Sequence, residues 1–245
     1  MGKKKVVGAL IAIAVILATT FITMDWALFY RCGAVEQCIV EGSRFQNIAK
    51  FVVTAIMTIV VFCIGENAHS PRDRKLLQAA FAMALCADFC MKIIHDASLF
   101  GICFFMVVQA LFIFRHTRKS DTDKHIPRFF IIPMATMILM GAFSAFGVFK
   151  SPTIPIALTY ASFLGSSLTA ACRVAKTGYY PTPSAKQIKW GLDLFFCCDI
   201  CVGLSSATGD DYSTRETIAT IAHNFVWIFY TPSLILLGLS GYKNK

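Results

Sequence analysis

Charged residues are scarce in this sequence. Only 15% of the 245 residues are charged and 56% are hydrophobic, against about 25% and roughly 45–50% in an ordinary soluble domain. A water-soluble fold has no place for such a surplus of apolar side chains. The lack of charge therefore excludes an ordinary soluble domain and indicates a protein that crosses a membrane several times.

Two further features are missing. The apolar blocks lack the polar–apolar alternation of β-barrel strands, and no connection between them is long enough for a soluble domain. Helices satisfy their own backbone hydrogen bonds in lipid, and most blocks approach the roughly 20 residues that span the hydrocarbon. We predict an all-α fold, a single domain over residues 1–245 that forms a polytopic bundle of eight transmembrane helices. The predicted segments are Val6–Tyr30, Phe45–Ile64, Leu76–Ile94, Leu99–Phe114, Phe129–Val148, Ile154–Cys172, Ile188–Leu204 and Ile218–Leu239.

The formal net charge of +9 raises the question of a nucleic-acid partner, so the positions of the 23 Lys and Arg residues matter. If the N-terminus is cytoplasmic, most of them fall in cytoplasmic loops, which is the positive-inside pattern of a membrane protein. We therefore expect both termini in the cytoplasm and no nucleic-acid partner. The first segment lacks a clear small-x-small cleavage site and is expected to remain as a helix. The minimal loops favour a bacterial cytoplasmic membrane.

Ionisable and polar side chains inside the predicted helices are the main functional signal, because such groups are costly in the membrane and commonly mark function. A rise of about 1.5 Å per residue places several of them in one slab of the bilayer, as a pocket requires. The deepest are Asp88, Gln109 and Asp199, and Lys50, Lys92 and His223 lie somewhat nearer the outer surface.

The two buried carboxylates are expected to differ in protonation. Lys92 follows Asp88 by four residues on the same helix face and would keep it ionised, whereas Asp199 has no cation within a turn. One ionised and one protonated aspartate can supply a general base and a general acid. The alternative is that Asp88 and Lys92 form a buried ion pair, with Asp199 bonded to Gln109 or His223, and only hold the bundle together.

Other polar positions are assigned to packing or to the membrane interface. Asp193 is expected to reach the interface beside Lys189, and Asp25 to belong to an interfacial belt with its aromatic neighbours. Trp227 and Tyr230 share a helix face with His223, but an aromatic stripe is usually packing, so only His223 is kept as a site candidate. On the predicted outer side, Cys32 and Cys38 can form a disulfide or stay reduced.

A short repeat links the two predicted carboxylate helices. Cys86–Cys90 and Cys197–Cys201 both read Cys-x-Asp-x-Cys, and each lies in the third helix of a four-helix half. This suggests a parallel duplication with half-repeats 1–115 and 116–245. On a helix the aspartate points away from the two cysteines, so one ion cannot bind all three. We expect no metal site and no cofactor.

Several motifs resemble those of the lysoplasmalogenase-like, or YhhN-like, integral membrane proteins. Lys50–Thr54 is similar to the family's Lys-Pro-Leu-Thr stretch without its proline, and Cys86–Asp88 to its small-Gly-Asp motif. Phe195–Asp199 is similar to its Phe-x-x-Ser-Asp motif, Tyr160 to its helix-six tyrosine and Phe229–Ser233 to its helix-eight end. The family's Gly-x-x-x-Phe-x-x-x-His pattern begins here at Gly101, but its histidine is replaced by Gln109, which cannot carry a proton near neutral pH.

The resemblance implies an eight-helix protein that hydrolyses the vinyl-ether bond of lysoplasmalogens to a fatty aldehyde and a glycerophospho-base. Asp199 would then protonate the vinyl carbon and Asp88 would direct water, or the reverse. Lys50 would meet the lipid phosphate, with the remaining candidates lining the substrate site: Lys92, Gln109, Tyr160 and His223. Two other functions stay open, a proton-coupled transporter or lipid-translocating protein and an inactive relative of the family.

Overall fold

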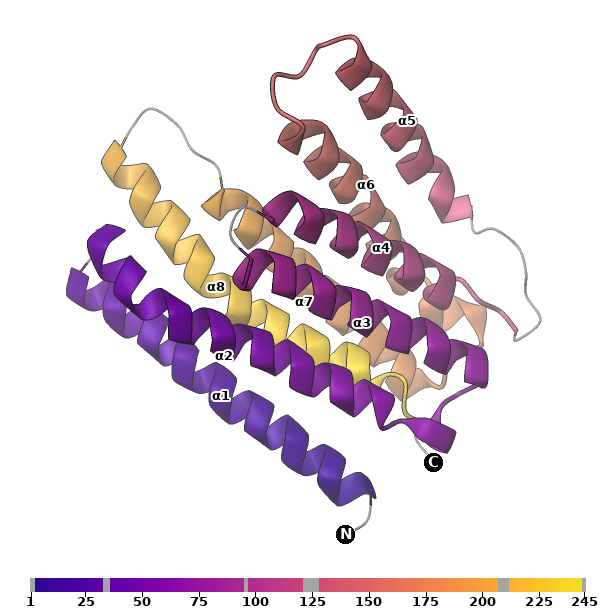
Figure 1. Ribbon diagram of the computed structural model, residues 1–245. Helices are drawn as coiled ribbons and strands as arrows, with labels where there is room; N and C mark the ends of the chain where they lie inside the picture. Colours follow the sequence, from indigo (N-terminus) through magenta and orange to yellow (C-terminus); the bar gives the residue numbers. More distant parts are fainter. Residues whose placement is uncertain (1–2, 33–35, 95–96, 121–127, 207–211, 244–245) are drawn as a thin grey trace.

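The computed structural model describes residues 3–32, 36–94, 97–120, 128–206 and 212–243. Within these ranges the chain forms eight α-helices and three short 3-10 helices, and no strand beyond one isolated bridge between Ala68 and Tyr242 (Figure 1). The α-helices are α1 (Lys3–Cys32), α2 (Glu36–Phe62), α3 (Pro71–Lys92), α4 (Ser98–His116), α5 (Ile131–Ala145), α6 (Thr153–Cys172), α7 (Thr182–Ser205) and α8 (Tyr212–Leu239). The 3-10 helices are η1 (Gly65–Asn67), η2 (Arg128–Phe130) and η3 (Val174–Thr177).

Each predicted segment corresponds to one helix, so the all-α prediction is confirmed. The ends differ where capping residues decide them. Ser70 caps α3 by accepting a hydrogen bond of 3.1 Å from the backbone N–H of Asp73, and Pro71 occupies its first turn, where the missing N–H costs nothing. Gly147 has a φ of 72°, a left-handed conformation typical of a helix end, and α5 stops at Ala145. The choice between a disulfide and free thiols at Cys32 and Cys38 lies outside the described side chains.

Six helices are long and apolar enough to cross a membrane: α1, α2, α4, α5, α6 and α8. The protein is therefore a multi-pass membrane protein. Among the described helices, α3 and α7 fall short because charged side chains interrupt them, including Asp88 in α3 and Asp199 in α7. These two helices carry the predicted catalytic groups. The count of eight spans and the cytoplasmic position of both termini stay predictions.

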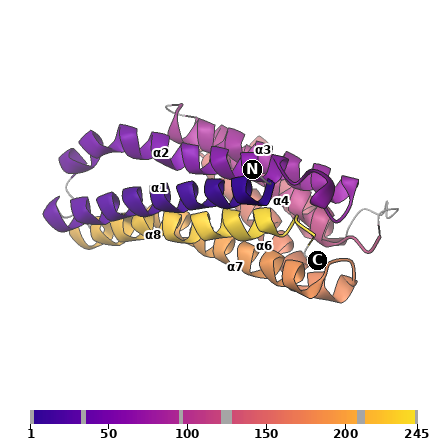
Figure 2. The same ribbon diagram turned by 90° about the horizontal axis from the view of Figure 1, so that it is seen from below.

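Neighbouring helices pack as pairs, α1 with α2, α3 with α4, α5 with α6 and α7 with α8. The pairs join because α2 contacts α3 and α8, α4 contacts α6, and α1 lies against both α2 and α8 (Figure 2). If α1–α4 and α5–α8 are taken as the two predicted half-repeats, the contact between α4 and α6 corresponds to the contact between α8 and α2. The internal duplication itself stays a prediction. α1 begins and α8 ends at the same end of the bundle (Figure 1), called here the termini end.

Candidate functional site

Asp88 lies in the middle of the bundle, where three helices meet. Its Oδ2 atom accepts a hydrogen bond of 2.6 Å from the Thr54 hydroxyl of α2 and one of 3.0 Å from the Tyr230 hydroxyl of α8. The three side chains are buried. The Tyr230 ring is held by edge contacts with Phe105 and Phe195, so its hydroxyl reaches the carboxylate from a fixed position. Tyr230 was assigned to packing from the sequence, and that interpretation was incomplete.

Asp199 is half-buried on α7 and has a different partner. Its Oδ2 atom accepts a hydrogen bond of 2.6 Å from the hydroxyl of Tyr160 on α6. Gln109 of α4 neighbours the same hydroxyl. Its side chain is fully buried, and neither its amide oxygen nor its amide nitrogen makes a hydrogen bond within the described part of the chain. Among the described residues, Asp199 forms no hydrogen bond with Gln109 or His223. The structural alternative, in which such a bond helps to hold the bundle together, is therefore wrong on this point.

The two carboxylates belong to one region but not to one hydrogen-bond network. Buried Cys198, which precedes Asp199 on α7, lies within electrostatic range of both Asp88 and Asp199. No hydrogen bond joins the two aspartates in the described structure, and each is held by its own tyrosine. A substrate that met both carboxylates would therefore approach the neighbourhood of Cys198.

Lys92 does not pair with Asp88 as the sequence spacing suggested. No ion pair joins these two described side chains, although Lys92 is half-buried within electrostatic range of Asp88, Lys50 and Asp25. A spacing of four residues brings two side chains to one face of a helix but does not by itself make a contact. The hydroxyls of Thr54 and Tyr230 bind Asp88 instead, so the structural alternative of a buried ion pair between Asp88 and Lys92 is wrong.

Lys50 forms its ion pair with a residue that the sequence assigned to the interface. Its Nζ lies 3.0 Å from Oδ2 of Asp25 on α1, and the two side chains are only 3% and 8% exposed. The ring of Phe21 lies 5.6 Å from the same ammonium group. Asp25 therefore belongs to the polar interior and not to an interfacial belt. The clue in the sequence was that Asp25 and Lys50 are opposite charges at similar predicted depth on consecutive helices.

A cavity of about 440 Å³ opens beside this ion pair, between α1, α2, α7 and α8 and away from the termini end. His223, whose ring is exposed, lines it together with Asp25 and Lys50. The amide nitrogens of two further lining residues, Gln46 and Asn224, have no hydrogen-bond partner within the described structure, although these side chains are only 5% and 4% exposed. The cavity thus gathers a cation, an anion and two unsatisfied donors.

Comparison with known proteins places the chain in a family. A model of the YhhN family matches residues 45–240, most of the chain. The chain belongs to the YhhN family. No curated protein and no solved structure matches it. The YhhN match covers Asp88, Asp199 and Lys50, whereas Asp25 lies before it. The resemblance inferred from the motifs is thereby confirmed.

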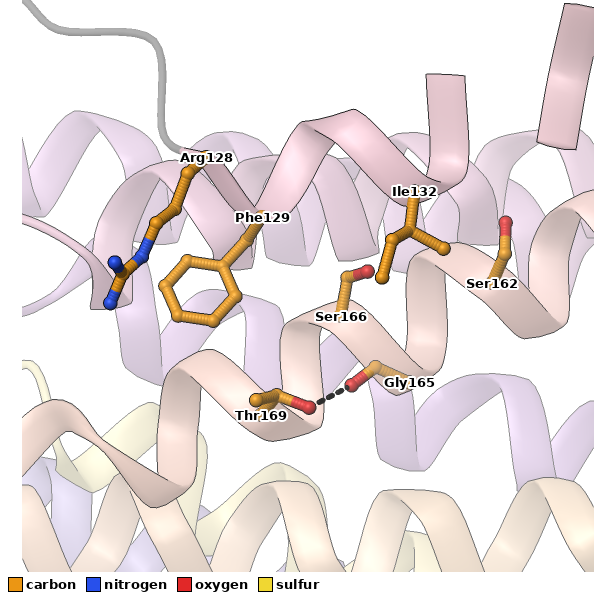
Figure 3. A pocket seen from close by; sticks show the side chains of 7 residues that line it. All are labelled: Arg128, Phe129, Ile132, Ser162, Gly165, Ser166 and Thr169. Atoms are coloured by element: carbon orange, nitrogen blue, oxygen red, sulfur yellow. Dashed lines mark hydrogen bonds between the residues drawn. The ribbon is translucent and has the colours of Figure 1, made fainter. Parts of the chain in front are cut away.

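The YhhN region also contains a second hollow, of about 500 Å³, between α5 and α6 (Figure 3). Arg128, Phe129 and Ile132 border it on one side and face Ser162 and Ser166 of α6. None of the predicted site residues lines this hollow. The candidate site is therefore the region of the two carboxylates together with the cavity beside Lys50.

A buried charged network holds the termini end of the YhhN region. Arg115 of α4 donates to both oxygens of Asp73, at 2.9 and 3.3 Å, and to the Ser240 hydroxyl at 2.9 Å, with no exposure of the ion pair. Tyr180 also donates to Asp73, and burial raises the pKa of its hydroxyl well above the usual range. The sequence analysis did not predict this network.

Two remaining expectations concern the surface and metals. Asp193 pairs with Lys189 at 2.7 Å on the partly exposed face of α7, as predicted. Among the described residues, no group of three or more His, Cys, Asp or Glu side chains lies close enough to hold a metal ion.

Proposed function

We propose that this protein is a membrane-embedded hydrolase that cleaves the vinyl-ether bond of lysoplasmalogens. The products are a fatty aldehyde and a glycerophospho-base. Membership of the YhhN family supports the lipid substrate. The observation that carries the proposal is the pair of carboxylates on α3 and α7, Asp88 and Asp199, each oriented by a tyrosine hydroxyl and both close to Cys198.

The reaction needs a proton donor and a site that activates water. Asp199 donates a proton to the β-carbon of the enol ether, and the electron pair of the double bond forms the new C–H bond. The resulting oxocarbenium ion is stabilised by the negative charge of Asp88, which then accepts a proton from the attacking water. The hemiacetal collapses when Asp88 returns its proton to the ether oxygen and the carbon–oxygen bond to the glycerol breaks. The hemiacetal hydroxyl gives its proton to Asp199 as it becomes the carbonyl of the aldehyde. One water molecule is consumed and both carboxyl groups return to their starting states.

The hydrogen bonds favour this assignment over the reverse one. Asp88 accepts two hydrogen bonds through one oxygen, which favours a carboxylate, whereas Asp199 accepts one. Lys92 lies within electrostatic range of Asp88 and adds to the stabilisation of its negative charge. Tyr160 orients Asp199, and Gln109 beside it is placed to orient the leaving group or water.

The test is product analysis with the purified protein in a non-ionic detergent. Vinyl-ether lysolipids should release aldehyde, and the matching ester lysolipids should release no free fatty acid. Asp88→Asn and Asp199→Asn should each abolish aldehyde release while keeping the wild-type elution profile. Asp193→Asn, on the same helix as Asp199 but in the partly exposed pair with Lys189, is the matched control and should keep full activity.

Two results would contradict the proposal. Full activity in either catalytic variant would remove that aspartate from the mechanism. No aldehyde release in detergent, combined with uptake or flipping of a lipid when the protein is placed between two compartments, would favour the transporter alternative.

A further inference from the structure

The cavity beside Lys50 has the properties of a binding site for an anion. Its only described ion pair, Lys50 with Asp25, occupies the lysine with a single carboxylate oxygen at 3.0 Å. An ammonium group offers three donors, so this contact leaves Lys50 able to bind a further acceptor. A phosphate has several strong acceptor oxygens and forms charge-assisted hydrogen bonds with such groups.

Two amides reinforce this choice of ligand. Gln46 and Asn224 line the same cavity, and their amide nitrogens are buried and lack hydrogen-bond partners in the described structure. Buried donors without partners are costly and call for an explanation. Both nitrogens are hydrogen-bond donors. An anion with several acceptor oxygens can therefore satisfy them, whereas a cation cannot.

The cavity also lies at a suitable depth. Lys50 is one helical turn, roughly 6 Å, from Thr54, which binds Asp88. His223 lies about two turns, roughly 10 Å, from Tyr230, which binds the same carboxylate. A glycerol backbone separates the phosphate of a lysolipid from its sn-1 ether by only a few bonds. A phosphate in the cavity thus directs the ether toward Asp88.

We propose that this cavity is a phosphate subsite, in which Lys50, Gln46 and Asn224 bind the headgroup phosphate of the lysolipid and the phosphate displaces Asp25 from Lys50. The inference rests on the proposed function for the identity of the lipid. It adds to that function a role for α1, which lies before the matched YhhN region. Asp25 acts as an internal competitor that holds Lys50 until an anion arrives.

The experiment measures binding without turnover. The full-length protein in non-ionic detergent is titrated with a 1-O-alkyl lysophospholipid, whose saturated ether cannot be protonated as an enol ether, and with the corresponding 1-O-alkylglycerol, which has no phosphate. Wild-type protein should bind the phospholipid more tightly. Inorganic phosphate is added as a competitor. Displacement of the phospholipid by millimolar phosphate would identify a site for free phosphate, whereas no displacement would identify a site for the lipid headgroup.

The variants separate the subsite from general stability. Gln46→Leu and Asn224→Leu should each weaken phospholipid binding by about tenfold and leave alkylglycerol binding unchanged. Gln187→Leu, which removes an amide on α7 outside the cavity, is the matched control and should bind as the wild type does. If a leucine variant does not fold, Asn224→Asp keeps the shape, replaces the donor by a carboxylate and should weaken binding further.

Variants of Asp25 and Lys50 give the sharpest outcome, because they should change phospholipid binding in opposite directions. Asp25→Asn should tighten phospholipid binding several-fold and enlarge the rise in melting temperature that the ligand causes, whereas Lys50→Met should weaken binding. Equal binding of both lipids, or losses no larger than in Gln187→Leu, would overturn the subsite. A protein that binds the phospholipid selectively but releases no aldehyde would overturn the proposed hydrolysis and leave the subsite standing.

Discussion

Tyr160 donates a hydrogen bond of 2.6 Å to Oδ2 of Asp199 and thereby joins α6 to α7. Thr54 makes a bond of the same length to Oδ2 of Asp88 and joins α2 to α3. Each carboxylate is thus oriented by a hydroxyl from the helix that precedes its own in the chain. Orientation of this kind is what proton transfer to a fixed substrate atom requires, because general acids and bases act only within hydrogen-bond reach.

Removing the Tyr160 hydroxyl should slow the reaction without unfolding the protein. We expect Tyr160→Phe to lower kcat for aldehyde release by about 10- to 100-fold, the value of one hydrogen bond to a charged or reacting group, with a smaller change in KM. Tyr30→Phe is the control, because the Tyr30 side chain is 81% exposed. A kcat equal to that of the wild type would show that Tyr160 does not position the acid.

Gln109 offers a gain-of-function test. Its amide is buried beside Tyr160 without a hydrogen-bond partner in the described structure, at the position where the YhhN-like motif has histidine. We expect Gln109→His to raise the turnover number, because an imidazole can relay a proton near neutral pH and an amide cannot. Gln109→Leu should not raise it. A histidine variant with unchanged or lower turnover would show that this protein does not need a relay at this position.

The sequence revealed the helices but only part of the site, for a physical reason. Apolar runs and capping residues are local, so the helices and the depth of Asp88 and Asp199 follow from the sequence. The partners of these groups are not local. Tyr230 lies 142 positions from Asp88, and no periodic pattern encodes that contact. The one local contact considered for Asp88, a buried ion pair with Lys92, does not form, because a shared helix face does not decide between competing donors.

The buried pair of Asp73 and Arg115 should dominate stability at the termini end. Replacing one member leaves the other charge buried without a partner, which costs about 3–5 kcal/mol. We expect Asp73→Asn and Arg115→Met each to lower the melting temperature strongly in detergent. Asp193→Asn should cost less than about 1 kcal/mol, since its pair with Lys189 is partly exposed. Similar melting temperatures for the three variants would show that the buried pair contributes no more to stability than the partly exposed pair.

His69 should make stability depend on pH. Its Nε2 atom lies 3.2 Å from both the Ser184 hydroxyl and the Ser240 carbonyl oxygen, in a loop outside the membrane-spanning helices. Burial lowers its pKa, aided by Arg115 and opposed by Asp73. The unfolded chain therefore binds more protons than the folded one below about pH 6.5, and stability falls as the pH drops through that range.

The measurement for His69 is the melting temperature at pH 7.5, 6.5 and 5.5, as rough steps across the ordinary histidine pKa. We expect the wild type to lose more stability on acidification than His69→Gln, whose amide keeps a donor for the Ser240 carbonyl. The variant serves as its own control for other titrating groups, which are the same in both proteins. Parallel curves for the two proteins would exclude His69 as the source of the pH dependence.

Gly191 should be needed for the packing of α7 against α8. A Cβ atom there would lie 2.7 Å from Cγ of Leu237 and 3.3 Å from its backbone nitrogen, so a side chain would have to push the two helices apart. We expect Gly191→Ala to cost about 1–3 kcal/mol and to reduce aldehyde release, because α7 carries Asp199. Gly141→Ala is the matched control in α5, where a Cβ meets nothing within 4 Å and alanine favours the helix. Equal melting temperatures of the two variants would mean that α7 and α8 do not depend on this close approach.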